Sequence, residues 1–84
     1  MHVYPNPISQ GQSLTISIDH PEEGYYTISL TAMNGQLMKQ EELWIDTEAR
    51  VLSIQPPKLS SGIYILTFTN KRTGKKVSEK VVVQ

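Results

Sequence analysis

Apolar and polar residues alternate along most of the chain with a period of two. In residues 14–18 (LTISI) and 26–32 (YTISLTA), apolar side chains occupy every second position. Successive side chains of a β-strand point to opposite faces, so each segment has one apolar and one polar face. No segment shows the i, i+3, i+4 spacing of an amphipathic helix. The pattern predicts antiparallel sheets with one face packed on a core.

Clusters of turn-forming residues separate the apolar segments. Asn34-Gly35 is the strongest hairpin signal, because both residues tolerate the positive φ that short hairpin turns require. Turns spaced by roughly 8–12 residues are typical of an all-β sandwich or barrel. We expect about seven strands, at residues 2–5, 13–18, 25–32, 36–45, 50–55, 63–69 and 76–83.

The most apolar segment, residues 63–68 (IYILTF), has little polar face of its own. A strand that is apolar on both sides is typical of the middle of a sheet. We therefore expect this strand to have a neighbour on either side and to be covered on both faces.

Size and composition limit the possible functions. The 84 residues suffice for a single domain, residues 1–84, with one modest core. The sequence contains no cysteine, which excludes a disulfide framework and a thiolate zinc site. The net charge is zero, which disfavours nucleic acid as a partner. We expect a monomer that needs no cofactor.

The charges are unevenly distributed along the chain. Seven of the eight acidic residues lie in residues 1–48, and seven of the eight basic residues lie in residues 49–84. Pairing of exposed charges across strands accounts for such a distribution. The alternative is a basic patch that faces a partner, formed by Lys71, Arg72, Lys75, Lys76 and Lys80.

Few residues could carry catalysis or bind a metal. The two histidines, His2 and His20, are not spaced as a metal pair, whereas a zinc site needs three or four converging ligands. No serine lies in a G-x-S-x-G motif. We therefore expect neither a metal site nor an enzyme. Tyr25 and Trp44 could stack on sugars, or they could simply add mass to the core.

No targeting or membrane segment is evident. The N-terminus lacks the basic and then apolar pattern of a signal peptide. No apolar segment reaches the roughly 18–20 residues needed to span a bilayer. We expect the chain to be a module excised from the C-terminus of a larger secreted protein, with any export signal outside it.

Four stretches, in this order, resemble one known family. They are residues 3–7 (VYPNP), 34–37 (NGQL), 59–66 (LSSGIYIL) and 80–83 (KVVV), and the pattern also includes Leu14-Thr15-Ile16 after the first stretch and Ile54 before the third. Together they are similar to the type A C-terminal sorting domain of the Bacteroidetes type IX (Por) secretion system, over nearly the whole chain. Each stretch alone is a weak signal, and their joint order is specific. The residues that carry the resemblance, and that are therefore candidates for recognition, are Tyr4, Pro5, Asn6, Pro7, Gly35, Leu59, Gly62, Tyr64, Lys80, Val81 and Val82.

The resemblance implies an immunoglobulin-like β-sandwich with a delivery function. Domains of this family are appended to the C-terminus of large secreted enzymes and adhesins. The type IX translocon recognises the domain in the periplasm and carries the protein across the outer membrane. A sortase-like surface protease usually removes the domain and attaches the cargo to lipopolysaccharide at the cell surface. The alternative is a structural or carbohydrate-binding immunoglobulin-like module of a secreted enzyme.

Two positions depart from the family pattern. Ala32 stands where an aspartate is common, and Pro56-Pro57 interrupt a stretch that is usually strand-like. Both lie in structural parts of the pattern, so they concern loop geometry more than sorting.

Physical roles can be assigned to several of the recognition candidates. Gly62 allows a tight turn before the apolar strand, and Tyr64 is expected to pack in the core. We expect residues 76–83 to form an edge strand, whose unpaired backbone groups can accept another strand. Our hypothesis is that the translocon reads this strand together with the basic turn before it.

The VYPNP segment is extended by its prolines. Pro5 and Pro7 fix their own φ and push the preceding residues toward extended backbone. A proline cannot donate to a β-ladder, so the segment is predicted to lie at a sheet edge. We expect Val3 and Tyr4 to pack on the core and the Asn6 side chain to close a local turn.

Overall fold

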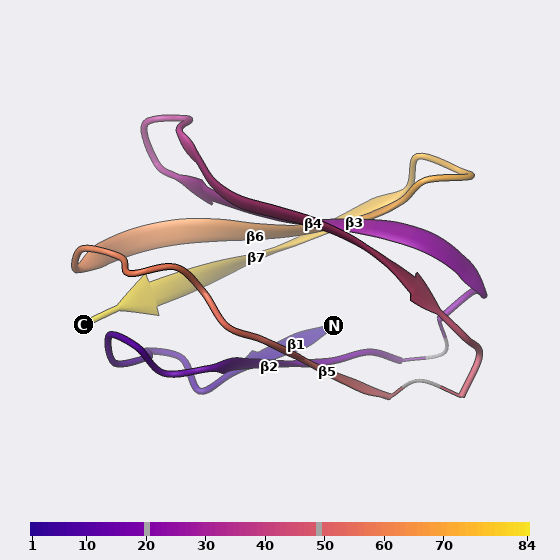
Figure 1. Ribbon diagram of the computed structural model, residues 1–84, viewed down its shortest axis with the longest axis horizontal. Helices are drawn as coiled ribbons and strands as arrows, with labels where there is room; N and C mark the ends of the chain where they lie inside the picture. Colours follow the sequence, from indigo (N-terminus) through magenta and orange to yellow (C-terminus); the bar gives the residue numbers. More distant parts are fainter. Residues whose placement is uncertain (20, 49) are drawn as a thin grey trace.

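The computed structural model describes residues 1–19, 21–48 and 50–84. These residues form seven β-strands in two sheets that pack face to face (Figure 1). Each predicted strand is present, and its ends lie within one residue of the prediction. The strands are β1 (His2–Tyr4), β2 (Leu14–Ser17), β3 (Gly24–Ala32), β4 (Leu37–Ile45), β5 (Val51–Ile54), β6 (Gly62–Asn70) and β7 (Lys76–Val83).

The two sheets differ in size. The small sheet has the strand order β1-β2-β5, and the large sheet has the order β4-β3-β6-β7. Neighbouring strands are antiparallel throughout. β6 lies between β3 and β7, which confirms that the most apolar strand is central in its sheet. β4 and β7 form the two edges of the large sheet.

The outer face of β6 is open to solvent. Ile63 is 42% exposed and Ile65 is half-buried, whereas Tyr64 and Leu66 on the inner face are buried. The expectation that both faces of this strand are covered is therefore wrong. The small sheet covers the large sheet from one side only (Figure 1), so the outward side chains of β6 have no second layer over them.

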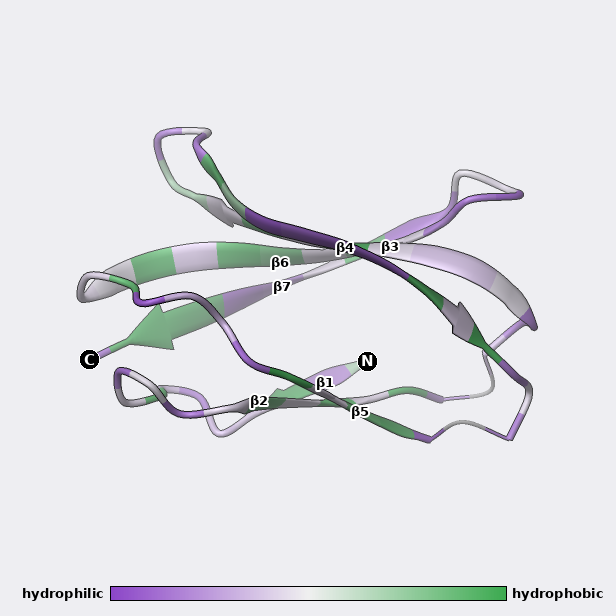
Figure 2. Cartoon of the chain, viewed as in Figure 1, coloured by the Kyte–Doolittle hydropathy of each residue, from purple (hydrophilic) through white to green (hydrophobic). Residues whose placement is uncertain are grey.

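The core lies between the sheets and is built from the alternating apolar residues. Figure 2 shows hydrophobic stretches in green in β6, at the C-terminal end of β7 and in the small sheet. The side chains with at most 1% exposure are Ile8, Leu14, Ile16, Leu30, Ile45, Leu66 and Val81. Three strands packed on four, antiparallel within each sheet, make an immunoglobulin-like β-sandwich.

The two central strands of the large sheet start in the same way. β3 begins at Gly24 and β6 at Gly62, with φ of +150° and +157°, a backbone region that L side chains rarely adopt. Two residues later comes a buried tyrosine. The Tyr26 hydroxyl donates to the Glu22 carbonyl at 2.7 Å, and the Tyr64 hydroxyl donates to the carbonyl four residues before it at 2.8 Å. Each is a tyrosine corner of the kind that fixes strand ends in immunoglobulin-like sandwiches.

These corners relate the β3–β4 and β6–β7 hairpins by an approximate two-fold axis. In the β3–β6 ladder, Ser29 pairs with Thr67, and the strands extend equally on either side of that pair. The two corners therefore lie at opposite ends of the large sheet.

No helix long and apolar enough to cross a membrane occurs in the described segments.

Candidate functional site

The N-terminal segment lies beside the last strand at one end of the sandwich. The Asn6 Nδ2 amide donates to the Lys80 carbonyl at 2.8 Å, and the Asn6 Oδ1 accepts from the Val82 N–H at 2.9 Å. The Ile8 N–H donates to the Val82 carbonyl at 2.8 Å, and the Gln84 N–H donates to the Ile8 carbonyl at 2.9 Å. The segment runs parallel to β7 here and adds a short strand to its outer edge.

The Asn6 side chain takes the place of a peptide group in this pairing. A carboxamide offers one carbonyl acceptor and an amide donor, as the backbone does. Pro5 and Pro7 have no N–H to offer, and the Tyr4-Pro5 and Asn6-Pro7 bonds are both cis. The expectation that Asn6 closes a local turn is wrong, because both of its hydrogen bonds reach β7.

The rest of the VYPNP segment matches the prediction in part. β1 is an edge strand of the small sheet and Val3 is buried, both as expected. Tyr4 is 47% exposed, so its expected packing on the core is wrong; the alternation of the strand turns it outward. Ile8, which is 1% exposed, was missed, although an apolar residue directly after the prolines could have indicated it.

We expect Asn6→Ala to lower the free energy of unfolding by about 1–3 kcal/mol, because two hydrogen bonds of about 0.5–1.5 kcal/mol each are lost. Hydrogen exchange of the Val82 amide should become faster. Asn34→Ala is the matched control, since the Asn34 Oδ1 accepts from the Gln36 N–H within the β3–β4 turn. An unchanged exchange rate at Val82 in Asn6→Ala would contradict this role of the side chain.

The valines of the C-terminal motif point in opposite directions. Val81 is fully buried and Val83 is 3% exposed, so both belong to the core. Val82, on the outer face, is half-buried, and Lys80 is exposed. The motif therefore combines two core residues with an outward-facing pair.

The stretch 59–66 lies on the opposite side of β7, and the β3–β4 turn lies beyond it, next to β6. In the β6–β7 ladder, Gly62 pairs with Val83 and Tyr64 pairs with Val81. The β3–β4 turn, which contains Gly35, starts beside Tyr64. Figure 1 shows these segments at the end of the sandwich where the C-terminus lies. All four stretches that carried the family resemblance thus lie together, although they are far apart in the sequence.

Most of the remaining recognition candidates lie in the core or in turns. Leu59 and Tyr64 are 4% and 6% exposed, which confirms the expected core packing of the tyrosine. Gly35 has a φ of +91° in the hairpin turn that Asn34-Gly35 predicted. Pro56-Pro57 follow β5 outside any strand. Whether a partner contacts any of these residues stays a prediction.

Two of the predicted basic patch residues are paired with acidic residues. Lys71 Nζ lies 2.9 Å from Glu42 Oε2, and Arg72 NH2 lies 3.0 Å from Glu22 Oε2. Pairing of exposed charges is therefore confirmed for these two. Within the described residues, no ion pair involves the other three, Lys75, Lys76 and Lys80. The candidate patch is thus reduced to the lysines in and just before β7.

Tyr25 and Trp44 form an exposed aromatic pair across β3 and β4. Each is 54% exposed, and their ring centroids lie 5.0 Å apart at an interplanar angle of 76°. The suggestion that they add mass to the core is wrong. They line a surface hollow together with Glu23, Lys71 and Arg72.

The described residues contain no group of three or more histidine, cysteine or acidic side chains that could hold a metal ion. His2 is exposed in β1. His20 lies outside the described residues. The groups at the site that could bind a partner are the backbone groups at the sheet edge, the lysines and the exposed aromatic rings.

Comparisons with known proteins agree with this picture. A family model described as the secretion system C-terminal sorting domain matches residues 2–84. The chain is similar to the crystal structure of CopC from Methylosinus trichosporium OB3b, with a TM-score of 0.63 and 20% sequence identity, covering 94% of this chain and 82% of that one. At this identity the likeness concerns the fold alone. A search of the curated proteins found no match.

Proposed function

Because the chain belongs to the family of C-terminal sorting domains of the type IX secretion system, we propose that it acts as a folded export signal for a cargo on its N-terminal side. Membership of this family implies a secreted or cell-surface protein. In the proposed route, the translocon recognises the domain in the periplasm and carries the cargo across the outer membrane. A sortase-like protease then removes the domain, and the cargo stays attached at the surface.

The convergence of the four motif stretches carries this proposal. Residues 6–8 lie on one side of the C-terminal half of β7, and the start of β6 lies on the other. The family motifs therefore describe one end of a folded sandwich, and a linear tail would not need the N-terminal motif. This supports recognition of a folded domain whose last strand lies at a sheet edge.

A reporter fusion tests the proposed function. Residues 1–84 are fused to the C-terminus of a periplasmic reporter in a cell with a working type IX system, and surface delivery is measured by protease accessibility. We expect delivery of the fusion and retention of the reporter alone in the periplasm. The same fusion in a translocon-deficient strain is the control. A fusion that stays in the periplasm of competent cells would overturn the proposal.

Deletion of residues 75–84 is a coarser test of the hypothesis that β7 is read. The deletion should abolish delivery, and normal delivery without these residues would sink that hypothesis. Because the deletion also removes Val81 and Val83 from the core, loss of delivery alone does not separate unfolding from loss of a contact.

Carbohydrate binding is a second candidate function. The observation in its favour is the exposed Tyr25–Trp44 pair beside charged side chains that could hydrogen-bond sugar hydroxyls. A glycan array with the Trp44→Ala variant as control tests it. Loss of an array signal in that variant would support sugar binding, and an array without signal would reject it.

A further inference from the structure

One part of the β7 edge has no backbone partner among residues 1–19, 21–48 and 50–84. Alternate residues of an antiparallel strand direct their N–H and C=O groups to opposite sides. Val82 and Lys80 direct theirs away from β6, toward the N-terminal segment. Lys76 and Ser78 face the same way in the unbroken β6–β7 register, and the described residues offer their backbone groups no partner. We call residues 76–79 the open edge.

The other sheet edges carry features that discourage strand addition. β1 and β5 have only 3 and 4 residues, and short edge strands offer few free backbone groups. β4 is longer, but Lys39 and Glu41 lie on its inner face, opposite Leu30 and Ile28, and form an ion pair of 3.8 Å. Inward-pointing charges of this kind protect an edge. The inner face of the open edge carries one half-buried charge, Glu79, and the apolar Val77 where β4 has Lys39.

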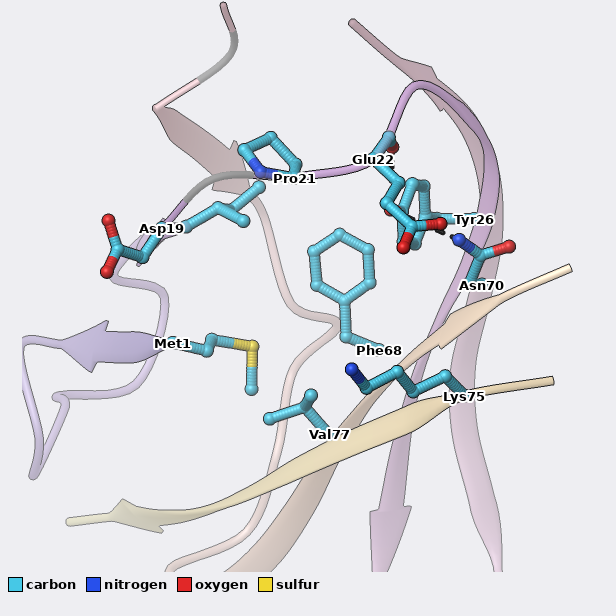
Figure 3. Close-up of a pocket in the computed structure, with 10 residues that line it drawn as sticks. Met1, Asp19, Pro21, Glu22, Tyr26, Phe68, Asn70, Lys75 and Val77 are labelled. Atoms are coloured by element: carbon cyan, nitrogen blue, oxygen red, sulfur yellow. Dashed lines mark hydrogen bonds between the residues drawn. The ribbon is translucent and has the colours of Figure 1, made fainter. Parts of the chain in front are cut away.

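A cleft opens beside Val77, with apolar side chains at its centre and Asp19, Glu22, Asn70 and Lys75 also in its lining, as Figure 3 shows. The Phe68 ring lies at its centre, with Met1 and Val77 on one side and Pro21 on the other. Val77 is 44% exposed. A strand added along the open edge would place an inward side chain next to Val77, at the mouth of this cleft.

The outer side of the open edge is basic. Lys76 and Lys80 lie on the outer face of β7 on either side of Ser78, and Lys75 precedes the strand. None of the three takes part in an ion pair within residues 1–19, 21–48 and 50–84. The outward side chains of an added strand would therefore lie next to positive charge. One of its inward side chains would lie next to apolar surface.

We propose that the open edge binds an extended peptide segment of a partner protein by strand addition, with apolar side chains facing the cleft and acidic side chains facing Lys76 and Lys80. Main-chain hydrogen bonds supply affinity in this mode, and alternate side chains supply specificity. The inference deepens the proposed function and rests on it, since the partner it describes is a component of the secretion machinery.

A second copy of the chain is a poor occupant of the open edge. Two β7 strands paired antiparallel about Ser78 would place Lys76 of one copy opposite Lys80 of the other. Like charges directly opposite each other destabilise a sheet. Charge complementarity therefore favours an acidic segment over self-association.

Binding of model peptides to the isolated 84-residue domain tests the inference. The probe is a seven-residue peptide that alternates valine and glutamate, with blocked ends, and the comparison peptide has lysine in place of glutamate. We expect NMR shift changes at residues 75–80 and Phe68. We also expect at least about tenfold tighter binding of the glutamate peptide, as two or three exposed ion pairs would give. Absent shifts, shifts centred on β4, or equal affinities would overturn the inference.

A proline scan separates edge pairing from general effects. Ser78→Pro removes an outward N–H and leaves the bonds of β7 to β6 intact, so peptide binding should fall at least about tenfold. Ser78→Ala, which loses only the contact of 3.1 Å with the Thr67 hydroxyl, should bind normally. Gln40→Pro, at the matching position of β4, should also bind normally. Normal binding by Ser78→Pro would overturn the inference.

Charge reversal keeps the inference testable if Ser78→Pro fails to fold. Lys76→Glu combined with Lys80→Glu changes two exposed side chains and should reverse the preference, so that the lysine peptide binds more tightly. An unchanged preference would overturn the inference. The proposed function has a separate readout, because delivery of the unmodified reporter fusion tests sorting whether or not either peptide binds.

Discussion

Replacing Tyr64 by alanine is expected to lower the free energy of unfolding by about 3–5 kcal/mol, the usual cost of deleting a buried aromatic side chain. Tyr64 is 6% exposed, and its hydroxyl donates to the Ser60 carbonyl at 2.8 Å. Small domains have total stabilities of about 5–15 kcal/mol. Urea unfolding followed by circular dichroism should therefore show a large loss of stability.

Conservative variants separate the parts of this effect. Tyr64→Phe removes only the hydrogen bond and should lower stability by about 0.5–1.5 kcal/mol. Tyr26→Phe removes the equivalent bond at the other end of the sheet and should have a similar cost. If Tyr64→Ala keeps wild-type stability but abolishes reporter delivery, Tyr64 is a contact residue and its structural assignment is wrong.

Val81→Asp is expected to destabilise the domain by about 3–5 kcal/mol, because it leaves a buried charge without a partner. Val81 has 0% exposure, and its neighbours across the ladder lie in the same core. The same change one residue later, Val82→Asp, places the carboxylate on the outer face. Val82→Asp should lower the free energy of unfolding by only about 1 kcal/mol, which is the full range of strand propensities measured in a host protein.

This pair of valine variants makes the reporter assay interpretable. Val81→Asp should abolish delivery through unfolding, which thermal denaturation of the purified domain would reveal. Val82→Asp leaves the fold intact, so a loss of delivery in that variant would point to a contact with the translocon. Equal stabilities of the two variants would contradict the orientation of the valine run.

Much of the fold could be predicted from the sequence, because a period of two is a local property. The alternation in residues 14–18 and 26–32 gave the correct strands, and residues 63–68 gave the correct central strand. Whether one or both faces of that strand are covered could not be predicted from the alternation. Ile63 and Ile65 are apolar, but a pattern within one strand carries no information on how many layers pack around it.

The site was harder to predict, because its contacts join distant parts of the chain. Asn6 was assigned to a turn on the basis of its neighbours, since side chains of this type often bond to nearby backbone. Its partners, Lys80 and Val82, lie at the other end of the sequence. The likeness of the two hairpins was also hidden, because few aligned positions are identical, among them Gly24 with Gly62 and the tyrosines two residues later.

The pairing of Asn6 with β7 also has a consequence for folding. The contacts from Asn6 to Lys80 and to Val82 span 74 and 76 positions of the chain. Contacts of such long range lower the folding rate, and they form only once both partners are available. The N-terminal motif can therefore adopt its hydrogen-bonded arrangement only after the last strand has been synthesised. Any incomplete chain ending before Lys80 lacks this end of the sandwich and would not display the surface that all four motif stretches build.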